Sequence, residues 1–315
     1  MSYAAPFSRP QFDPTAIHAP LAVLRAAVLA HDWPGVAGAF AELQDEDQKV
    51  SASAVVGDVA GVERFLQHIA DGQPDAALPR VLLAHRLIFA GWDIRSSLRA
   101  EHVSREQFEE FHAYLRRAEA LLIDVCAVEP DNALAWYLRL VTARGLQLGQ
   151  SEARRRYDRL TEHHPDHWAA RGALLQQLCP KWGGSWEAAF GFAREVAATA
   201  PPGSPSHAVI AQVHLERWMD LGGREGTAHL KDPAVRAELH AAAAASVFHP
   251  QFRAGFHWVS AHNYFAAAHC LAGRHGDAAP HFRALGDAAT EHPWDYVGTP
   301  AAEFTRHRRT ALAKG

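Results

Sequence analysis

Five of the chain's X-Pro steps, between residues 129 and 293, each follow a helix-like segment. They are Glu129-Pro130, His164-Pro165, Ala200-Pro201, His249-Pro250 and His292-Pro293. The residue before a proline is disfavoured in the helical region, so each step predicts the end of a helix. Successive prolines lie 35, 36, 49 and 43 residues apart. The first two intervals match a repeat made of two antiparallel helices.

Glycine marks the other turn of each predicted unit. The helical runs after the first four prolines each end at a glycine: Asp131 to Gly149, Asp166 to Gly183, Ser204 to Gly222 and Gln251 to Gly273. Glycine closes a helix at little cost because it has no Cβ to clash in the left-handed conformation. The partner helices then begin at residues suited to capping, namely Ser151, Ser185, Asp232 and Asp277. The pattern predicts a unit of helix, glycine turn, helix and proline turn.

The same pattern predicts helices at both ends of the chain. Upstream helices are expected over Leu21 to Ala30, Pro34 to Leu43 and Asp75 to Gly91, and an S-x-x-Q capping box at Ser104 opens a long helix ending at Glu129. The segment from Gly91 to Ser104 is expected to be an irregular insertion, and Pro300 to Ala313 a closing helix. Because no window alternates as a strand does, the chain is predicted to be all-helical.

This organisation resembles the tetratricopeptide repeat family from about residue 19 to about residue 293. The length of the two central units, the proline that ends each second helix, and packing residues such as Trp136-Tyr137 and Ala169-Ala170 carry the resemblance. The last units are longer than the family's repeat, and no unit has the full consensus. The P-K-W-G-G-S turn at residues 180–185 also looks like one found in uncharacterised bacterial proteins of this repeat-like kind.

The resemblance implies an all-α fold of antiparallel helical hairpins stacked into a right-handed superhelix, or α-solenoid. Residues 1–18 would form an N-terminal extension, residues 19–293 the repeat domain, and residues 294–315 a closing helix and tail. In such a stack the first helices line a concave groove, which is where a peptide or protein partner is expected to bind.

Composition gives the chain ordinary globular character and no strong charge. Its 315 residues are 48% hydrophobic, with a formal net charge of −4. We therefore expect no nucleic-acid binding, although Arg154, Arg155, Arg156 and Arg159 form one local basic face. The chain shows neither a signal peptide nor a run of about 18 apolar residues, so we expect a cytoplasmic protein without a membrane partner. Three widely spaced cysteines suit buried, reduced thiols.

The stretch from Leu178 to Phe190 looks most like a site. A phosphate-binding loop would need lysine after the glycines and a strand before them, whereas Lys181 precedes Gly183 and Gly184. A turn between two helices fits better, with Pro180 ending the first helix and Ser185 capping the second. A turn does not require Lys181 and Trp182, so these two residues are candidates for contact with a partner or for packing between repeats.

Two matching stripes of histidine and aromatic residues occupy the predicted first helices of neighbouring units. The groove candidates are His207, His214, Trp218, Trp258, His262, Phe265 and His269. In each stripe the residues recur at helical spacing and share one face. Packing and hydrogen bonding between helices is the favoured interpretation of these histidines, and contact with an organic ligand or peptide is the functional one.

A metal site is not predicted from these stripes. Histidines seven residues apart rise about 10.5 Å along a helix, so an ion would need one histidine from each helix, such as His214 and His262. Glu216 or Asp220 would then have to supply a carboxylate. No local metal motif, cofactor motif or catalytic constellation occurs, and we predict no metal, no cofactor and no catalytic residue.

Other polar clusters are interpreted as solvated. His163, His164 and His167 flank a proline turn, and Asp45 to Asp47 are expected on a solvated helix face or loop. The leading hypothesis is a non-enzymatic binding or scaffold protein that holds a peptide or protein in its groove. The alternative is an enzyme, or a small-molecule or metal-binding protein, with a His/Trp-lined pocket in that groove. A third hypothesis is self-association through the ends of the stack, with the loop from Gly222 to Lys231 covering an edge or binding a copy.

Overall fold

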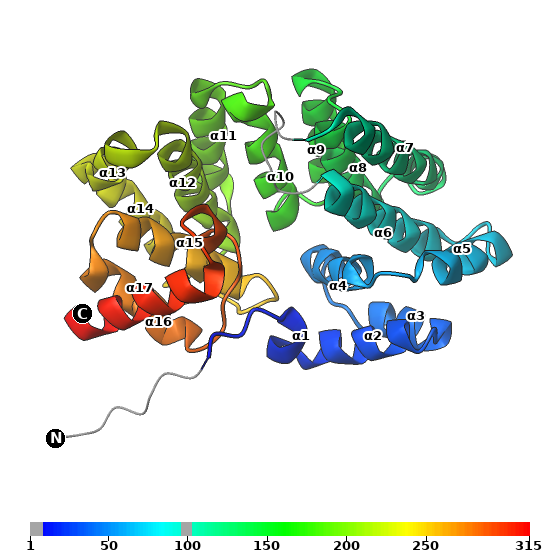
Figure 1. Ribbon diagram of the computed structural model, residues 1–315, viewed down its shortest axis with the longest axis horizontal. Helices are drawn as coiled ribbons and strands as arrows, with labels where there is room; N and C mark the ends of the chain where they lie inside the picture. The colour runs from blue at the N-terminus through cyan, green and yellow to red at the C-terminus, as the bar shows by residue number, and fades with distance from the viewer. Residues whose placement is uncertain (1–8, 96–102) are drawn as a thin grey trace. The chain divides into compact units, whose positions relative to one another are not determined.

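The computed structural model describes residues 9–95 and 103–315, which form 17 α-helices and no strand (Figure 1). An isolated bridge between Gln11 and Ala288 is the nearest approach to a sheet within these ranges. The prediction of an all-helical chain is thus confirmed. The chain divides into two compact units, which we call the N-terminal unit, His18–Gly184, and the C-terminal unit, comprising residues 9–17 and Ser185–Gly315.

The N-terminal unit consists of helices that pack mainly on their neighbours in the chain, most extensively α6 on α7. Their bounds are α2 (Ala19–Leu29), α3 (Trp33–Ala41), α4 (Glu46–Asp58), α5 (Glu63–Gly72), α6 (Ala77–Arg95), α7 (Arg105–Val128), α8 (Ala133–Gly145), α9 (Gln150–His163) and α10 (Trp168–Leu178). A short 3-10 helix, η2 (Pro180–Trp182), follows. Leu66, Leu82 and Leu122 are among its fully buried side chains.

The C-terminal unit also packs neighbour on neighbour, with α15 on α16 and α16 on α17. Its helices are α1 (Pro14–Ile17), α11 (Trp186–Thr199), η3 (Pro205–Ala208), α12 (Val209–Leu221), α13 (Gly223–Lys231), α14 (Pro233–Ala245), α15 (Trp258–Leu271), α16 (His275–Leu285), η4 (Trp294–Tyr296) and α17 (Pro300–Lys314). Phe282, Trp294 and Phe304 form a buried aromatic core, in which Trp294 Nε1 donates to Asn263 Oδ1 at 2.6 Å.

Side-chain caps explain where several helices begin. Asp32, Asp45 and Asn132 each accept a hydrogen bond from the backbone N–H three residues later. Ser104 and Gln107 form the predicted capping box at the start of α7. Such caps satisfy N–H groups that have no partner inside the helix.

Several predicted helix bounds are wrong. Helix α6 continues past Gly91 to Arg95, so the first residues of the predicted insertion are helical, while 96–102 lie outside the described residues. Helices α4 and α5 were not predicted. Helix α4 buries residues all round instead of along one stripe, which removes the helical periodicity. Helix α5 does bury one face, through Leu66 and Ala70, and was missed in spite of it. Helices α14 and α16 end at Ala245 and Leu285, several residues before the X-Pro steps expected to end them.

The predicted loop from Gly222 to Lys231 is also wrong, because this segment forms α13. The helix was not predicted because glycine has a low helix propensity. Gly226 is buried where a Cβ would lie 2.5 Å from the carbonyl oxygen of Trp218, so close packing requires glycine there. Leu230, near the C-terminal end of α13, is fully buried.

Residues 9–17 of the predicted extension, and residues 294–315 of the predicted closing helix and tail, belong to the C-terminal unit. The backbone of Gln11 exchanges hydrogen bonds with Asp287 and Ala289, and the Phe12 ring packs on Phe304. Helix α17 packs on α16. Within the described residues, no helix is both long and apolar enough to cross a bilayer.

Candidate functional site

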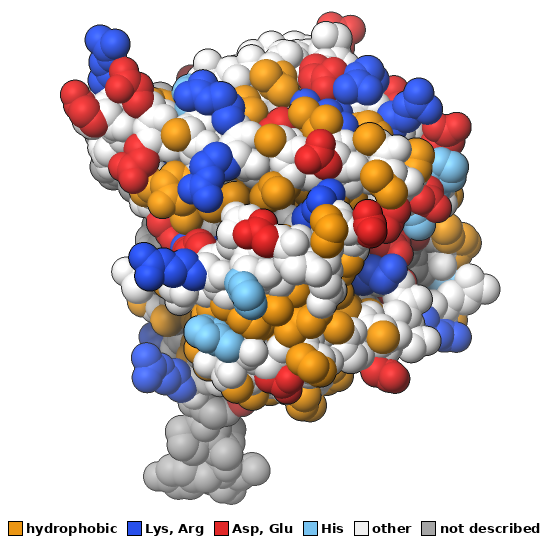
Figure 2. Space-filling view, turned by 90° about the vertical axis from the view of Figure 1, so that its right-hand side faces the viewer, with side chains coloured by type: hydrophobic (Ala, Val, Ile, Leu, Met, Phe, Trp, Pro, Cys, Tyr) orange, Lys and Arg blue, Asp and Glu red, His pale blue; other side chains and the backbone are white. Residues whose placement is uncertain are grey.

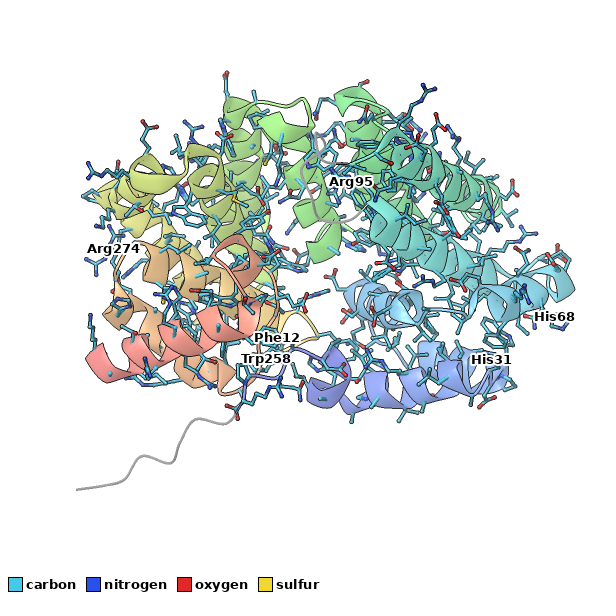
Figure 3. All side chains as sticks on the ribbon, viewed as in Figure 1. Phe12, His31, His68, Arg95, Trp258 and Arg274 are labelled. Carbon is cyan, nitrogen blue, oxygen red and sulfur yellow. The ribbon has the colours of Figure 1, made fainter. Side chains whose placement is uncertain are left out.

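All of the predicted groove residues belong to the C-terminal unit, and most of them are buried in its interior. His207, His214, His262, Phe265 and His269 are each 5% exposed or less, while Trp218 and Trp258 are half-buried. Trp258, labelled in Figure 3, begins α15, and Arg274 follows that helix. The structure therefore places the two stripes between packed helices, where a peptide on the protein surface would not touch the five buried members.

The structure does not bring His214 and His262 together as a pair; each has a different histidine partner. His214 Nδ1 lies 3.0 Å from His229 Nε2, and His214 Nε2 lies 3.0 Å from Glu238 Oε2. Glu238 on α14 also accepts a hydrogen bond from Arg194 Nε at 2.8 Å. The result is a chain of carboxylate, imidazole and imidazole that runs from α14 through α12 to α13.

The electrostatics of this chain follow from its contacts. The hydrogen bond from His214, opposed by burial and assisted by Arg194, lowers the pKa of Glu238 to about 2. Burial, followed by the charge of His214, lowers the pKa of half-buried His229 to about 4. At neutral pH this hydrogen-bonded series therefore has the ionised Glu238 carboxylate at one end and the neutral His229 imidazole at the other.

A second histidine pair lies deeper in the same unit. His262 Nδ1 and His281 Nδ1 are 3.1 Å apart, so one ring donates and the other accepts. Phe265 stacks on His281 and Phe248 tilts against it. Burial lowers the pKa of His262 to about 4 and that of His281 well below its ordinary value. Both rings are therefore neutral near pH 7, as an apolar setting requires.

A third group joins α14, α15 and α16. His240 Nε2 lies 3.1 Å from Asp277 Oδ2, and the His240 ring meets the buried His269 ring edge to face. Arg236 donates to both oxygens of Asp277 at 2.9 Å. Although burial raises it, hydrogen bonds from Arg236 and His240 bring the pKa of Asp277 below its usual value. Burial lowers the pKa of His269 to about 4.

Sequence reasoning missed the partners in all three groups. His229, His240, His281 and Glu238 were not candidates, and Asp277 was expected only to cap a helix. No spacing along the chain could reveal them, because each lies on a different helix from the residue it contacts.

The stretch from Leu178 to Phe190 forms a turn built as the sequence suggested. Helix α10 ends at Leu178, Gly183 has a φ of +83°, and Ser185 caps α11 by accepting from Ala188 N. A Cβ on Gly184 would lie 2.0 Å from the Leu178 carbonyl oxygen, so only glycine fits.

The two turn candidates, Lys181 and Trp182, differ in their surroundings. Trp182 packs edge to face on Trp92, with the Arg144 guanidinium over its ring. Its carbonyl accepts hydrogen bonds from Gln150 and Gln177. These contacts give Trp182 a packing role between helices of the N-terminal unit. Lys181 is exposed.

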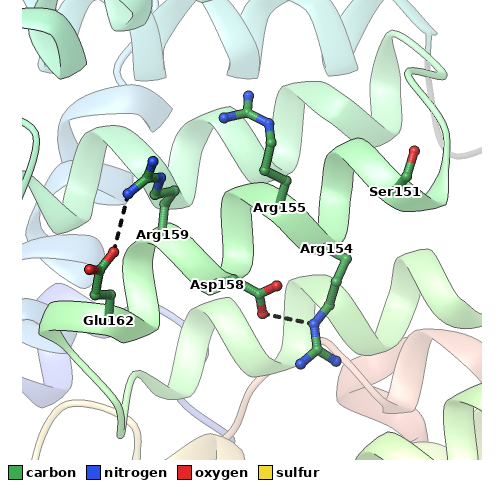
Figure 4. Close-up of a pocket in the computed structure, with 6 residues that line it drawn as sticks. All are labelled: Ser151, Arg154, Arg155, Asp158, Arg159 and Glu162. Carbon is green, nitrogen blue, oxygen red and sulfur yellow. Dashed lines mark hydrogen bonds and ion pairs between the residues drawn. The ribbon is translucent and has the colours of Figure 1, made fainter.

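The predicted basic face on α9 consists of Arg154, Arg155 and Arg159, which carboxylates balance (Figure 4), whereas Arg156, predicted on the same face, is buried. Arg154 pairs with Asp158 at 2.7 Å and Arg159 with Glu162 at 3.3 Å. Arg155 and Arg156 both contact Glu152. The shallow depression there is lined by α9 alone, from Ser151 to Glu162, so it is a solvated helix face.

Two clusters expected to be solvated prove partly structural. His167 is 1% exposed, accepts from Ala170 N at the start of α10, and stacks on Tyr137. Asp47 accepts hydrogen bonds from the backbone N–H groups of Trp168 and Ala169. The solvated interpretation is wrong for these two residues, because packing within the N-terminal unit joins positions more than a hundred residues apart.

No known protein family model matches the chain, and no curated protein matches it.

Proposed function

We propose that this protein is a non-enzymatic binding or scaffold protein that docks a protein partner, built from hairpins in a tetratricopeptide-like stack. The single observation that carries the proposal is the outward face of α2. Its members are Ala19, Ala22, Val23, Ala26, Leu29 and Ala30, which we call the α2 stripe. Every one of them is exposed.

The α2 stripe departs from what a solvated helix normally shows. The opposite side of α2 buries Leu21, Leu24 and Val28 against α3 and α4. A surface helix with one buried face carries polar residues on the other, and a helix that is apolar all round is normally covered on all sides. Val23 and Leu29 are nevertheless 66% and 63% exposed.

Charge supports the same proposal. Arg25, the one charged residue of α2, lies beside the stripe and pairs with Asp58 of α4 at 3.7 Å. The stripe therefore presents apolar surface with no charge of its own, as the core of a protein interface does. Hydrophobic side chains also gather over the lower part of Figure 2, where α2 to α5 lie in Figure 1.

The burial of the histidines favours this surface over the predicted groove as the docking site. A partner could reach His214 or His262 only by separating helices that bury them. The α2 stripe requires no such opening. We propose a partner with an apolar helix or strand face of its own, bound in the cytoplasm; a second copy of the chain is one form that this partner could take.

The proposal is tested by placing charge on the stripe. The double variant Val23→Glu, Leu29→Glu should reduce capture of the partner by the tagged full chain from native extract at least tenfold, because a carboxylate buried in an apolar contact is unpaired. Val128→Glu, at a site 72% exposed on α7, is the matched control and should capture normally. Sedimentation velocity of the purified chain separates a second copy from another protein.

Unchanged capture and unchanged sedimentation in the double variant would contradict the proposal. Equal loss in the Val128→Glu control would contradict it too, since the effect would then be one of surface charge in general. Circular dichroism of each variant shows that the helices are retained.

A further inference from the structure

Three helices of the C-terminal unit bring two imidazoles and a carboxylate to one point. His240 comes from α14, His269 from α15 and Asp277 from α16, and one ligand atom of each lies within 4.8 Å of the other two. His240 Nε2 and Asp277 Oδ2 are already 3.1 Å apart. Only helix packing joins these residues, which explains why the local spacings in the sequence predicted no metal.

His269 supplies a second, independent observation. Its side chain is 2% exposed, and its Nδ1 has no hydrogen-bond partner. A buried ring nitrogen without a hydrogen-bond partner costs free energy unless another group binds to it. The neutral imidazole is also the form that binds metals.

We propose that His240, His269 and Asp277 bind a divalent transition-metal ion of the zinc class. Two imidazole nitrogens and one carboxylate oxygen form a donor set that suits Zn²⁺. With ligand bonds near 2 Å, donors in a tetrahedral site lie about 3.4 Å apart. The widest donor separation in the cluster is at most 4.8 Å, so metal binding would shorten it by no more than about 1.4 Å. His240 can supply this movement, because its side chain is 47% exposed. Its exposed side leaves the fourth position to water.

Arg236 competes with the ion for the same carboxylate. Its guanidinium donates to both oxygens of Asp277 and is half exposed, so it can swing away into solvent. The metal ion must displace Arg236 from Asp277, and this reduces the affinity of the site for the metal ion. Removing the guanidinium should therefore strengthen metal binding, an effect opposite in sign to that of removing a ligand.

The neighbouring histidine pair provides a matched comparison. His214 Nδ1 and His229 Nε2 are 3.0 Å apart, but Glu238 occupies the other nitrogen of His214. Within residues 9–95 and 103–315, the His240 cluster is the one set of three donors that meets within reach of a single ion. His292 and Asp295 form an exposed pair at 3.0 Å that also lacks a third donor.

Titration of the full chain with Co²⁺ alone, followed by displacement with Zn²⁺, tests the site. We expect one Co²⁺ per chain, with the visible absorption of a low-coordinate site. His240→Ala and Asp277→Asn should weaken Co²⁺ binding at least tenfold. Arg236→Gln should tighten it several-fold, and His229→Ala and His292→Ala should leave it unchanged.

Three outcomes would overturn the proposal. They are no saturable Co²⁺ binding by the native chain, equal affinity in His240→Ala, or loss of binding in His229→Ala. His240 and Arg236 are exposed, so their variants are expected to fold, and circular dichroism verifies this for each. The outcome does not depend on the α2 stripe, which lies in the N-terminal unit.

Discussion

A buried ion network in the N-terminal unit is the clearest case in which one residue determines stability. Glu119 on α7 is 8% exposed and contacts Arg139, Thr142 and Arg156. Arg156 on α9 is 3% exposed and shares Glu119 with Arg139 of α8. A single carboxylate therefore joins three helices. Removing it would leave the Arg139 guanidinium without a carboxylate partner, while Arg156 would keep only Glu152.

We predict that Glu119→Gln lowers the free energy of unfolding by about 3–5 kcal/mol, the usual cost of breaking a buried ion pair from one side. Urea denaturation followed by circular dichroism measures it. Glu162→Gln is the control: Glu162 pairs with Arg159 on the exposed face of α9, and its loss should cost less than about 1 kcal/mol. Equal midpoints in the two variants would show that the network does not stabilise the fold.

A buried histidine of the N-terminal unit makes stability depend on pH. Burial lowers the pKa of His85 to about 3, and its Nδ1 lies 2.9 Å from Ser53 Oγ. Below pH 6.5 the unfolded chain binds a proton at this residue, whereas the folded chain does so only near pH 3. The contribution of His85 to stability is therefore present above pH 6.5 and is lost as the pH falls toward 3.

The predicted loss is at most about 1.4 kcal/mol per pH unit for this one group. Urea unfolding of the native chain and of His85→Gln between pH 7 and pH 4 measures it. The slope of unfolding free energy against pH should be shallower in the variant. His163→Gln, at an exposed position, should keep the native slope. Parallel slopes for the native chain and His85→Gln would contradict the assignment.

At the scale of the element, the turn between α10 and α11 is fixed by one glycine. Gly184 is enclosed by backbone, with the Leu178 carbonyl 2.0 Å from where a Cβ would lie. Gly191 on α11 has nothing within 4 Å of its Cβ position. We predict that Gly184→Ala lowers the thermal midpoint. Gly191→Ala should be neutral or stabilising by up to about 1 kcal/mol, since alanine suits a helix interior better. Equal midpoints would contradict this account of the turn.

Elements could be predicted from the sequence where the signal is local. The capping box at Ser104 and the cap at Ser185 lie where the sequence placed them, because both depend on residues three apart. Helix α13 could not be predicted, because its glycines contradict helix propensity and its order comes from packing on Trp218. Likewise, the X-Pro step at Pro250 comes five residues after α14 ends at Ala245.

The candidate sites were predictable only in part, for a related reason. The stripes on α12 and α15 could be predicted from helical spacing, so His214, His262 and His269 were among the candidates, whereas His207 lies on the separate 3-10 helix η3. Their partners His229, His281 and Asp277 lie on other helices. Periodicity shows which residues share a face, but it does not show which face is turned toward another helix. The exposed apolar face of α2 could not be predicted from the sequence, because the exposure of each side chain is known only from the structure.

In the molecule as a whole, the two units have different proposed roles. The N-terminal unit carries the α2 stripe, and the C-terminal unit carries the histidine groups and the proposed metal site. Polar networks join helices within each unit: the one around Glu119 is buried, and the one around Glu238 is half-buried. Neither network is needed for docking at α2, so the two proposals can fail separately.

Site-specific photo-crosslinking tests directly whether a partner binds at the α2 stripe. A photoreactive amino acid replaces Ala26 at the centre of the α2 stripe or, as control, the exposed Ala120 of α7. The control position lies beside Arg116 and Asp124 on a polar helix face. In native extract, the chain labelled at residue 26 should give one dominant crosslinked band of defined mass, at least tenfold stronger than at residue 120. Equal or absent crosslinking at the two positions would contradict the account.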